Sequence, residues 1–142
     1  MFVRPAVVED KNTISALLMQ LDYPGTESFI VEKIERLLAH PDAVLLVAQD
    51  NNQVVGVISL HFVPQLALSG DFCRISYFCV GDGARGQGVG NMLEAAAMHE
   101  AVRRGCDRIE VHCHSRRSRA HEFYFRQGFE ESPKYLMKML RA

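Results

Sequence analysis

Apolar residues recur along the chain with two different periods, and these periods predict the order of helices and strands. A short β-prone run at 2–8 comes first, and two stretches with helical spacing follow it. Their apolar faces are Ile14, Leu17, Leu18 and Leu21 in the first stretch and Ile30, Ile34, Leu37 and Leu38 in the second. Pro24 and Gly25 separate the two stretches, so we expect two helices, the second capped by Thr26.

Continuous apolar and β-branched runs fill the middle of the chain and predict strands. The polar turn at 50–53 joins two of them into a hairpin. Alternation at the fourth run places Ile109 and Val111 on one face and Glu110 and His112 on the other. The expected strands are 43–48, 54–62, Phe72–Val80, 109–113, and one or two within 129–140 around Ser132 and Pro133.

Two further helices are expected between the later strands. One begins near Val89, keeps a slim apolar face and stops at Gly105; the other covers Ser118–Arg126 and stops at Gly128. The order β-α-α-β-β-β-α-β-α-β-(β) predicts a mixed α/β fold, a sheet flanked by helices. A length of 142 residues with 48% apolar content suits one domain, residues 1–142.

The charge balance narrows the classes of partner. The chain has 16 Lys and Arg against 17 Asp and Glu. Because it has no global basic field, we do not expect it to bind nucleic acid or an acidic membrane. No apolar run reaches the roughly 20 residues that span a bilayer, and the N-terminus lacks a signal-peptide pattern. The four cysteines form no C-x-x-C pair. We therefore expect a cytoplasmic protein with reduced, packed cysteines and no metal site.

A glycine-rich segment follows the strand Phe72–Val80 and opens the next helix. Its six residues are Arg85, Gly86, Gln87, Gly88, Val89 and Gly90. The first N–H groups of a helix lack internal partners, and the helix dipole adds about half a positive charge there. Glycines let a phosphate approach the backbone, and an arginine adds a charge-assisted contact. The segment therefore predicts a phosphate site.

Two common nucleotide motifs do not fit this segment. A P-loop requires Lys and Ser or Thr after its second glycine, whereas Gln87 and Gly88 follow Gly86 here. A dinucleotide fingerprint requires a third glycine where this chain has Asn91. The ligand is therefore expected to be another phosphate compound.

The remaining pattern is Q/R-x-x-G-x-G/A, which Arg85, Gly88 and Gly90 satisfy. It resembles the pyrophosphate loop of the GNAT family of N-acetyltransferases. A second segment, from Ala120 to Phe129, resembles the A-x-x-F-Y-x-x-x-G-F segment of that family. The start, Arg4-Pro5-Ala6 with Glu9-Asp10, is also typical of it. The resemblance therefore extends over almost the whole chain.

The resemblance implies the GNAT fold, with a mixed sheet of six to seven strands and about four flanking helices. The sheet is expected to splay between the strands ending at Val80 and Cys113, and acetyl-CoA enters the gap. Its pantetheine arm pairs with the backbone of the strand, as an added strand would. The implied cofactor-binding residues are Phe78, Cys79, Val80, Arg85, Gly86, Gln87, Gly88, Val89, Gly90, Arg117 and Tyr124. No metal is implied, and His112, Cys113 and His114 point to alternate faces of a strand, which argues against zinc.

The chemistry implied by the resemblance is direct attack of an amine on the thioester, without an acyl-enzyme. Tyr124 is the candidate acid for the departing thiolate; its alternative role is packing the last helix on the sheet. The N–H of Cys79 or Val80 is the expected donor to the carbonyl oxygen, and the Cys79 thiol is expected only to pack. The strand Phe72–Val80 lacks the glutamate of many relatives, so His61 and His112 are candidate bases. A water chain and an ordinary surface role for both histidines stay open.

The acceptor is expected to be a small molecule with a primary amine. Its pocket is expected between 21–29 and 64–71. The sequence R-x-x-A-H-x-F-Y from Arg117 to Tyr124 resembles a subgroup that includes aminoalkylphosphonate N-acetyltransferases. Arg116, Arg117 and Arg119 then contact CoA phosphates or an acidic acceptor, or form a solvated helix start.

Three alternatives concern the reaction and the assembly. One is a protein or peptide N-acetyltransferase, and another is a non-catalytic acetyl-CoA sensor, which the missing strand carboxylate favours. The resemblance is also compatible with a homodimer in which the final strands pair or swap.

Overall fold

The computed structural model describes residues 1–113, 117–131 and 136–141. Two short 3-10 turns, η1 and η2, interrupt the regular elements. The elements in chain order are β1 (Phe2–Pro5), η1 (Val8–Asp10), α1 (Lys11–Gln20), α2 (Ile30–Ala39), β2 (Ala43–Asp50), β3 (Gln53–Val63), β4 (Phe72–Val80), η2 (Asp82–Ala84), α3 (Val89–Arg103), β5 (Arg108–Val111) and α4 (Ser118–Arg126).

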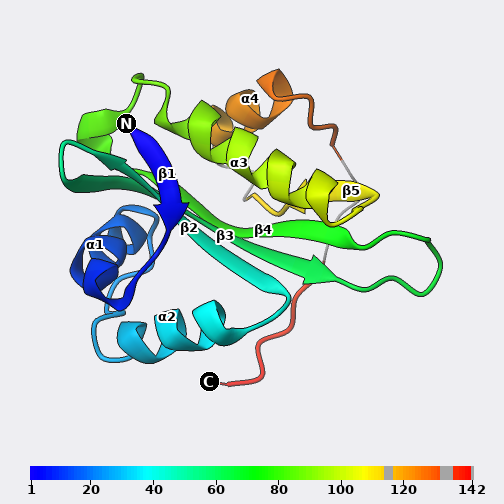
Figure 1. Cartoon of the computed structure of the whole chain (residues 1–142), viewed down its shortest axis with the longest axis horizontal. Coiled ribbons are helices and arrows are strands. Elements are labelled where there is room, and N and C mark those ends of the chain that lie inside the picture. The colour runs from blue at the N-terminus through cyan, green and yellow to red at the C-terminus, as the bar shows by residue number, and fades with distance from the viewer. Residues whose placement is uncertain (114–116, 132–135, 142) are drawn as a thin grey trace.

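The described strands form one mixed sheet in the order β1-β2-β3-β4-β5. The first four pair antiparallel; η1, α1 and α2 lie between β1 and β2, and β2 joins β3 through a short turn. β5 pairs parallel to β4 because α3 carries the chain back across the sheet between them. Helices α1 and α2 lie on one side of the sheet and α3 and α4 on the other (Figure 1).

Each face of the sheet has its own hydrophobic core, because successive side chains of a strand point to opposite faces. In β2, Val47 packs toward α1 and α2, whereas its neighbour Ala48 packs toward α3. Both side chains are fully buried. The continuous apolar run of β2 therefore reflects a central strand covered on both faces.

The N-terminal strand is tied to the start of α1 by an ion pair. The guanidinium of Arg4 donates two hydrogen bonds of 2.9 Å to the carboxylate of Asp10 and a third to Gln49 on β2. The Val7 N–H also donates to Asp10. The bond from Arg4 holds the pKa of Asp10 below its ordinary value. These contacts fix α1, whose C-terminal end contributes to the site described below.

The sheet opens between β4 and β5. The two strands pair only from Phe72 with Arg108 to Ile75 with Val111. β4 continues alone on that side to Val80, and a register shift against β3 leaves Ser76 as an extra residue just beyond the last pair. A bulge strengthens the local twist, so the free half of β4 diverges from β5. The predicted splay is present.

Two strand predictions differ from the structure. The last described strand ends at Val111 rather than at Cys113, and the described sheet has five strands rather than six or seven. Residues 129–131 and 136–141 are not strands, while 132–135, with Ser132 and Pro133, lie outside the described residues. Leu136 and Leu140 are about nine-tenths exposed. The apolar content of this segment predicts a strand, but no strand of the described residues pairs with it.

The second helix also begins later than predicted. α2 starts at Ile30, and Thr26 does not cap it, because its hydroxyl donates to Ser15 at 2.8 Å. The carbonyl of Thr26 instead accepts from the N–H of Ile30. Thr26 therefore anchors the connection to α1 rather than the start of α2.

Candidate active site

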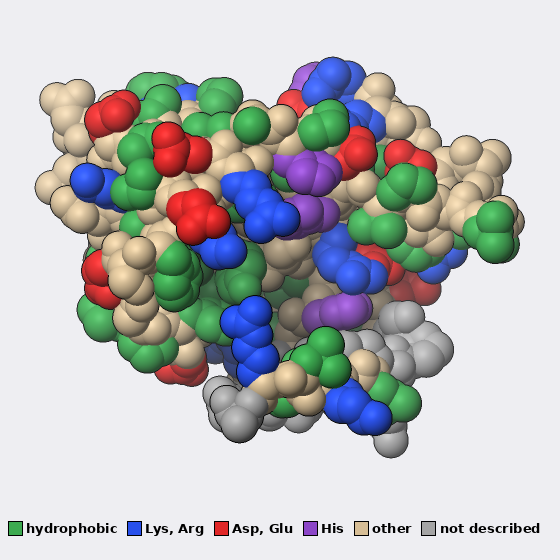
Figure 2. Space-filling view, turned by 90° about the horizontal axis from the view of Figure 1, so that it is seen from below, with side chains coloured by type: hydrophobic (Ala, Val, Ile, Leu, Met, Phe, Trp, Pro, Cys, Tyr) green, Lys and Arg blue, Asp and Glu red, His purple; other side chains and the backbone are tan. Residues whose placement is uncertain are grey.

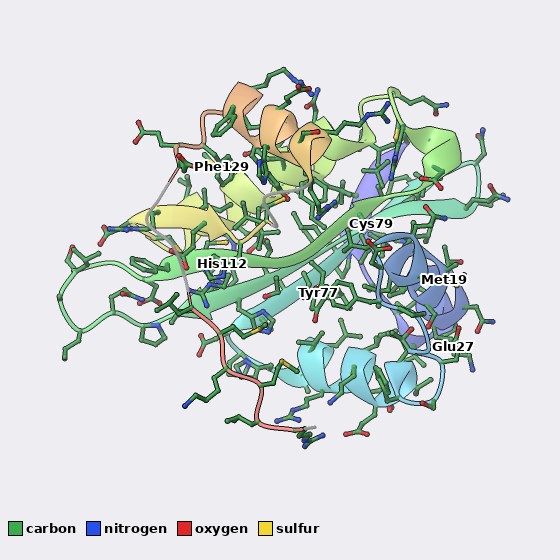
Figure 3. All side chains as sticks on the ribbon, turned by 180° about the vertical axis from the view of Figure 1, so that it is seen from behind. Met19, Glu27, Tyr77, Cys79, His112 and Phe129 are labelled. Carbon is green, nitrogen blue, oxygen red and sulfur yellow. The ribbon has the colours of Figure 1, made fainter. Side chains whose placement is uncertain are left out.

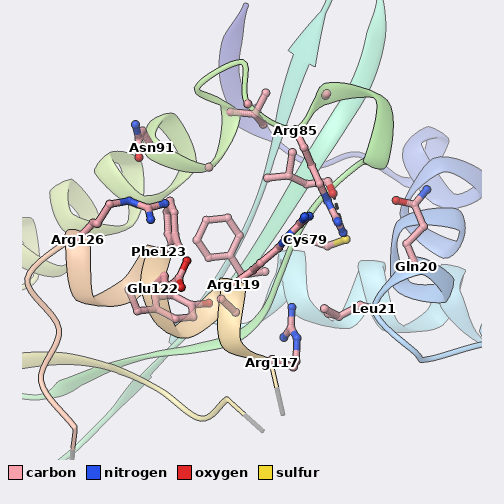
Figure 4. A pocket seen from close by; sticks show the side chains of 18 of the residues that line it. Gln20, Leu21, Cys79, Arg85, Asn91, Arg117, Arg119, Glu122, Phe123 and Arg126 are labelled. Atoms are coloured by element: carbon pink, nitrogen blue, oxygen red, sulfur yellow. Dashed lines mark hydrogen bonds between the residues drawn. The ribbon is translucent and has the colours of Figure 1, made fainter. Parts of the chain in front are cut away.

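A cleft of about 900 Å³ opens where β4 leaves β5, and we name it the splay cleft. It is bordered by the end of α1, the free half of β4, the glycine-rich loop and α4 (Figure 4). Its lining residues are Gln20, Leu21, Asp22, Phe78, Cys79, Val80, Ala84, Arg85, Gly86, Gly88, Val89, Gly90, Asn91, Arg117, Ser118, Arg119, Ala120, Glu122, Phe123, Tyr124 and Arg126.

The glycine-rich loop presents its backbone to this cleft. Gly86 and Gly88 adopt φ values of 79° and 83°, a conformation that side chains other than hydrogen disfavour. Gly88 is the N-cap of α3, and no side chain among the described residues caps that helix start. The first N–H groups of α3 therefore stay available for an anion, and the helix dipole favours a negative charge there.

Gly90 has a different role from the one its motif suggests. A Cβ built on Gly90 would lie 3.1 Å from Cε1 of Phe123, closer than ordinary van der Waals contact. Gly88 has open space around the same position. Gly90 therefore allows α4 to pack closely on α3, while Gly86 and Gly88 shape the loop.

Cationic side chains outnumber anionic ones around the splay cleft. Arg85 comes from the loop, Arg117 and Arg119 from the start of α4 and Arg126 from its end (Figure 4). Asp22 and Glu122 are the acidic residues in the lining. Arg85 also bridges Asp82 at 3.0 Å, with both side chains more than half exposed. Such an exposed pair is weak, so Arg85 can turn toward a phosphate at little cost.

The free edge of β4 exposes alternate backbone groups. The N–H of Gly81 donates to the carbonyl of Val55 at 2.8 Å. Bonded and non-bonded pairs alternate along an antiparallel ladder, so Cys79 faces β3, whereas Phe78 and Val80 turn their backbone toward the cleft. Val80, not Cys79, therefore has the N–H that can serve a ligand carbonyl.

Tyr124 closes the inner end of the cleft. Its ring makes edge-to-face contacts with Phe78 at 6.2 Å, Phe123 at 5.5 Å and Phe129 at 5.3 Å between centroids. The residue is 8% exposed, and burial raises the pKa of Tyr124 well above its ordinary value. The hydroxyl is thus protonated at any physiological pH. The ring packs α4 on the sheet, as one of its two predicted roles requires, and the residue also lines the cleft, so the acid role stays a prediction.

The Cys79 thiol lies in the core beneath α1, although the residue also borders the splay cleft. It donates to the carbonyl of Leu17 at 3.2 Å, within the core under α1. Burial raises the pKa of Cys79, against the opposing charges of Arg85 and Arg117. A buried, protonated thiol is a poor nucleophile, which agrees with its expected packing role.

A second cavity, of about 400 Å³, lies between α1, α2 and the opposite face of the sheet, and we name it the α2 cavity. Its lining residues are Ile14, Leu18, Tyr23, Thr26, Phe29, Ile30, Lys33, Ile34, Arg36, Leu37, Leu45, Val57, Ser59, His61 and Tyr77. Tyr77 lies on the side of the sheet toward α2 (Figure 3) and meets Tyr23 edge to face at 5.3 Å. Along β4, Tyr77 lines this cavity and the next residue, Phe78, lines the splay cleft.

His61 lies in the α2 cavity. Its Nδ1 is 2.8 Å from the hydroxyl of Ser76, the bulged residue of β4. Burial is the main cause that lowers the pKa of His61, and the charges of His40 and Arg74 add to it. The imidazole is therefore neutral at pH 7, with one ring nitrogen protonated and the other an acceptor.

Most of the predicted site residues line one of the two cavities. All predicted cofactor-binding residues line the splay cleft except Gln87, whose side chain turns back to the carbonyl of Gly83. His112 lines neither cavity and lies further along the sheet from Cys79 (Figure 3). For the acceptor pocket, Tyr23, Thr26 and Phe29 line the α2 cavity, but no residue of 64–71 does. Arg116 lies outside the described residues.

Other residues of the cleft were missed from the sequence. Gln20 and Asp22, at the end of α1, reach it only because the fold brings α1 beside β4, and Gln20 accepts from the Asp82 N–H at 3.0 Å. Glu122 and Arg126 lie one turn apart on α4 and line it as well. They are four residues apart within the predicted helix Ser118–Arg126, which places them on the same face of it as neighbours, and this spacing was the signal that could have found them.

The surface, the metal-ligand residues and the helices add three findings. Seen from below, Lys and Arg side chains are interspersed with Asp and Glu (Figure 2). Across residues 1–113, 117–131 and 136–141, no three His, Cys, Asp or Glu side chains gather as metal ligands. In the same part of the chain, every helix is too short or too polar to cross a bilayer.

Comparison with known proteins identifies the family. The acetyltransferase (GNAT) family matches residues 12–129, and the chain belongs to it. The N-acetyltransferase class predicted from the sequence is thereby confirmed, with acetyl-CoA as the acyl donor of the family.

Individual relatives agree with the family but differ in acceptor. The chain is 31% identical over 135 residues to an aminoalkylphosphonate N-acetyltransferase of Salmonella typhimurium, covering 92% of this chain and 85% of the relative. It is 29% identical over 135 residues to an aminoglycoside N(6')-acetyltransferase of Klebsiella aerogenes, covering 91% and 89%. A crystal structure described as a transcriptional regulator from Bacillus halodurans shares the fold, with a TM-score of 0.88, 24% identity and coverage of 97% and 98%.

Proposed function

We propose that this protein, as a single cytoplasmic domain, transfers the acetyl group of acetyl-CoA to the primary amine of a small molecule by direct attack. The observation that carries the proposal is that successive residues of β4 line two different cavities. Phe78 and Val80 border the splay cleft, and Tyr77 borders the α2 cavity. A thioester from the first and an amine from the second can come into contact where the sheet opens beside the free half of β4.

The donor half of the proposal rests on the loop and the strand edge. The uncapped start of α3, with Gly86 and Gly88, holds the pyrophosphate, and Arg85 and Arg117 add charge. The pantetheine arm pairs with the outward backbone of Phe78 and Val80, as an added strand would. Both sets of contacts are to groups shared by every acyl-CoA.

The chemical step forms one bond and breaks one. The amine nitrogen attacks the thioester carbon, and the Val80 N–H stabilises the oxygen as negative charge develops. The C–S bond then breaks, and the Tyr124 hydroxyl donates a proton to the sulfur of CoA. The products are an N-acetyl amine and CoA thiol, and the proton lost by the amine returns to Tyr124 through solvent or the base.

We infer that His61 is the base. If its Nδ1–H donates to Ser76, its Nε2 lone pair faces the α2 cavity and can take a proton from the ammonium form of the acceptor. The lowered pKa of His61 keeps it unprotonated at neutral pH. His112, outside both cavities, is not needed in this scheme.

The size of the α2 cavity favours a small acceptor over a protein chain. A volume of about 400 Å³ is typical of a small-molecule site. The test is release of CoA thiol from acetyl-CoA with a panel of small amines, aminoalkylphosphonates and peptides. We expect release with at least one small amine. Release only with peptides favours a protein acetyltransferase, and tight CoA binding without release for any acceptor overturns the proposal in favour of a sensor.

A further inference from the structure

The lining of the α2 cavity is mainly apolar. Seven aliphatic side chains from α1, α2, β2 and β3, together with the three rings of Tyr23, Phe29 and Tyr77, form most of it. Phe29 and Tyr23 are about half exposed although they are aromatic. Exposed rings around a concave apolar site are a common feature of surfaces that receive an apolar ligand.

The polar side chains of this lining are a minority, and two of them are bonded within the protein. The Thr26 hydroxyl is bonded to Ser15 at 2.8 Å, and His61 is bonded to Ser76 at 2.8 Å. Burial, together with the neighbouring Tyr23, raises the pKa of Tyr77, so its hydroxyl is neutral. A polyhydroxylated acceptor finds only a few hydroxyl, imidazole and cationic groups here to replace its hydration.

The charges at the cavity are of one sign. Lys33 and Arg36, both on α2, are its fixed charges, and no carboxylate belongs to its lining. Both side chains are exposed, so they border the cavity at its solvent side. A polycation such as an aminoglycoside meets repulsion here, whereas an acidic group on an acceptor meets two cations.

We propose that the acceptor is an amine with a ring-sized apolar body that also carries an acidic group. The body packs against Tyr23, Phe29 and the aliphatic lining, the acidic group faces Lys33 and Arg36, and the amine points to His61 and β4. The inference rests on the proposed acetyl transfer and names its substrate class. It separates this chain from its relative that acetylates aminoglycosides, whose acceptors are polycations.

The experiment compares four acceptors at fixed acetyl-CoA: para-aminomethylbenzoate, benzylamine, aminoethylphosphonate and kanamycin. We expect kcat/KM to be highest for para-aminomethylbenzoate, about threefold to tenfold above benzylamine because exposed charge pairs are modest. It should exceed aminoethylphosphonate, which lacks the ring, by about tenfold or more. Kanamycin should be the poorest acceptor.

Variants assign the preference to residues. Replacing both cations, Lys33→Gln with Arg36→Gln, should bring the ratio of para-aminomethylbenzoate to benzylamine close to one, whereas the surface control Lys11→Gln should leave the ratio unchanged. Phe29→Ala should lower kcat/KM for both ring-bearing amines by about tenfold and change aminoethylphosphonate less. Thermal melting of each variant verifies that it is folded.

The outcomes separate this inference from the function beneath it. Preference for kanamycin or aminoethylphosphonate overturns the acceptor class but leaves acetyl transfer intact. If no amine releases thiol, calorimetry of para-aminomethylbenzoate with CoA-loaded protein decides. If the compound binds and the double variant Lys33→Gln with Arg36→Gln binds it more weakly, the cavity assignment is supported and the proposed reaction is overturned. If the compound does not bind, both are overturned.

Discussion

The splay cleft and the α2 cavity both border β4, yet they are made of different groups. The cleft offers backbone N–H groups, glycines and four arginines, and its key loop is one continuous segment. The cavity offers apolar and aromatic side chains from α1, α2, β2, β3 and β4. In the proposed function, backbone groups of the cleft recognise what all acyl-CoA molecules share, and side chains of the cavity recognise what distinguishes one amine from another. A family can therefore keep the first site and change the second.

The largest effect is expected from Tyr124→Phe, which removes the hydroxyl from the splay cleft and keeps the ring. If the hydroxyl protonates the leaving thiolate, kcat should fall about 100-fold or more, as for loss of a general acid. The dissociation constant for CoA should stay within about twofold, because the ring contacts remain. Rapid-mixing and steady-state thiol release measure the first quantity, and calorimetry the second. Unchanged kcat would restrict Tyr124 to packing.

Gly88→Val tests the backbone character of the cleft. A side chain at a φ of 83° strains the loop by about 1–2 kcal/mol, and its Cβ enters the space of the phosphate. CoA affinity should fall about 30-fold. The matched control is Gly105→Val, with a φ of 70° and equally open space far from the cleft. It should lower the melting temperature similarly and keep CoA affinity; equal loss in both variants would make the effect one of folding.

His61→Gln probes the chemistry of the α2 cavity. The lowered pKa of His61 predicts an acid limb of kcat/KM below its ordinary value of 6.5, because the base is lost as pH falls through the folded-state pKa. The contribution of His61 to the free energy of unfolding, present above pH 6.5, should be lost as the pH falls through its lowered pKa. The variant should lower kcat/KM about tenfold at pH 7.5 and lose the limb. An unaltered limb would assign the base elsewhere, to a water chain.

Arg85→Ala should have the smallest effect. An exposed cation next to a phosphate contributes modestly, so CoA affinity should fall about threefold to fivefold, and less at high salt. Arg103→Ala is the matched control, since Arg103 forms an exposed pair with Glu100 at the same spacing, outside the cleft. Calorimetry at two salt concentrations distinguishes the two variants. An equal response of both would show that Arg85 does not meet the ligand.

The difference between the two sites also explains what the sequence could predict. The loop from Arg85 to Gly90 was readable because strand, glycines and helix start are adjacent in the chain. The lining of the α2 cavity was only partly foreseen, because Tyr23 and Tyr77 meet solely through the fold. Gly90 fitted the motif for a reason the motif does not state, its contact with Phe123. The strand prediction at 129–140 was wrong within the described residues, since apolar content alone does not supply a pairing partner.

The most direct test of the account is an amide-resolved NMR titration of the protein with CoA. Binding of the pyrophosphate at the start of α3 predicts the largest shifts at Gly86, Gly88 and Val89, with a further shift at Val80. The amides of Ile34 and Ser59, in the α2 cavity, should move little until an amine is added. Large shifts in the α2 cavity with CoA alone, and none in the loop, would contradict the assignment of the two sites.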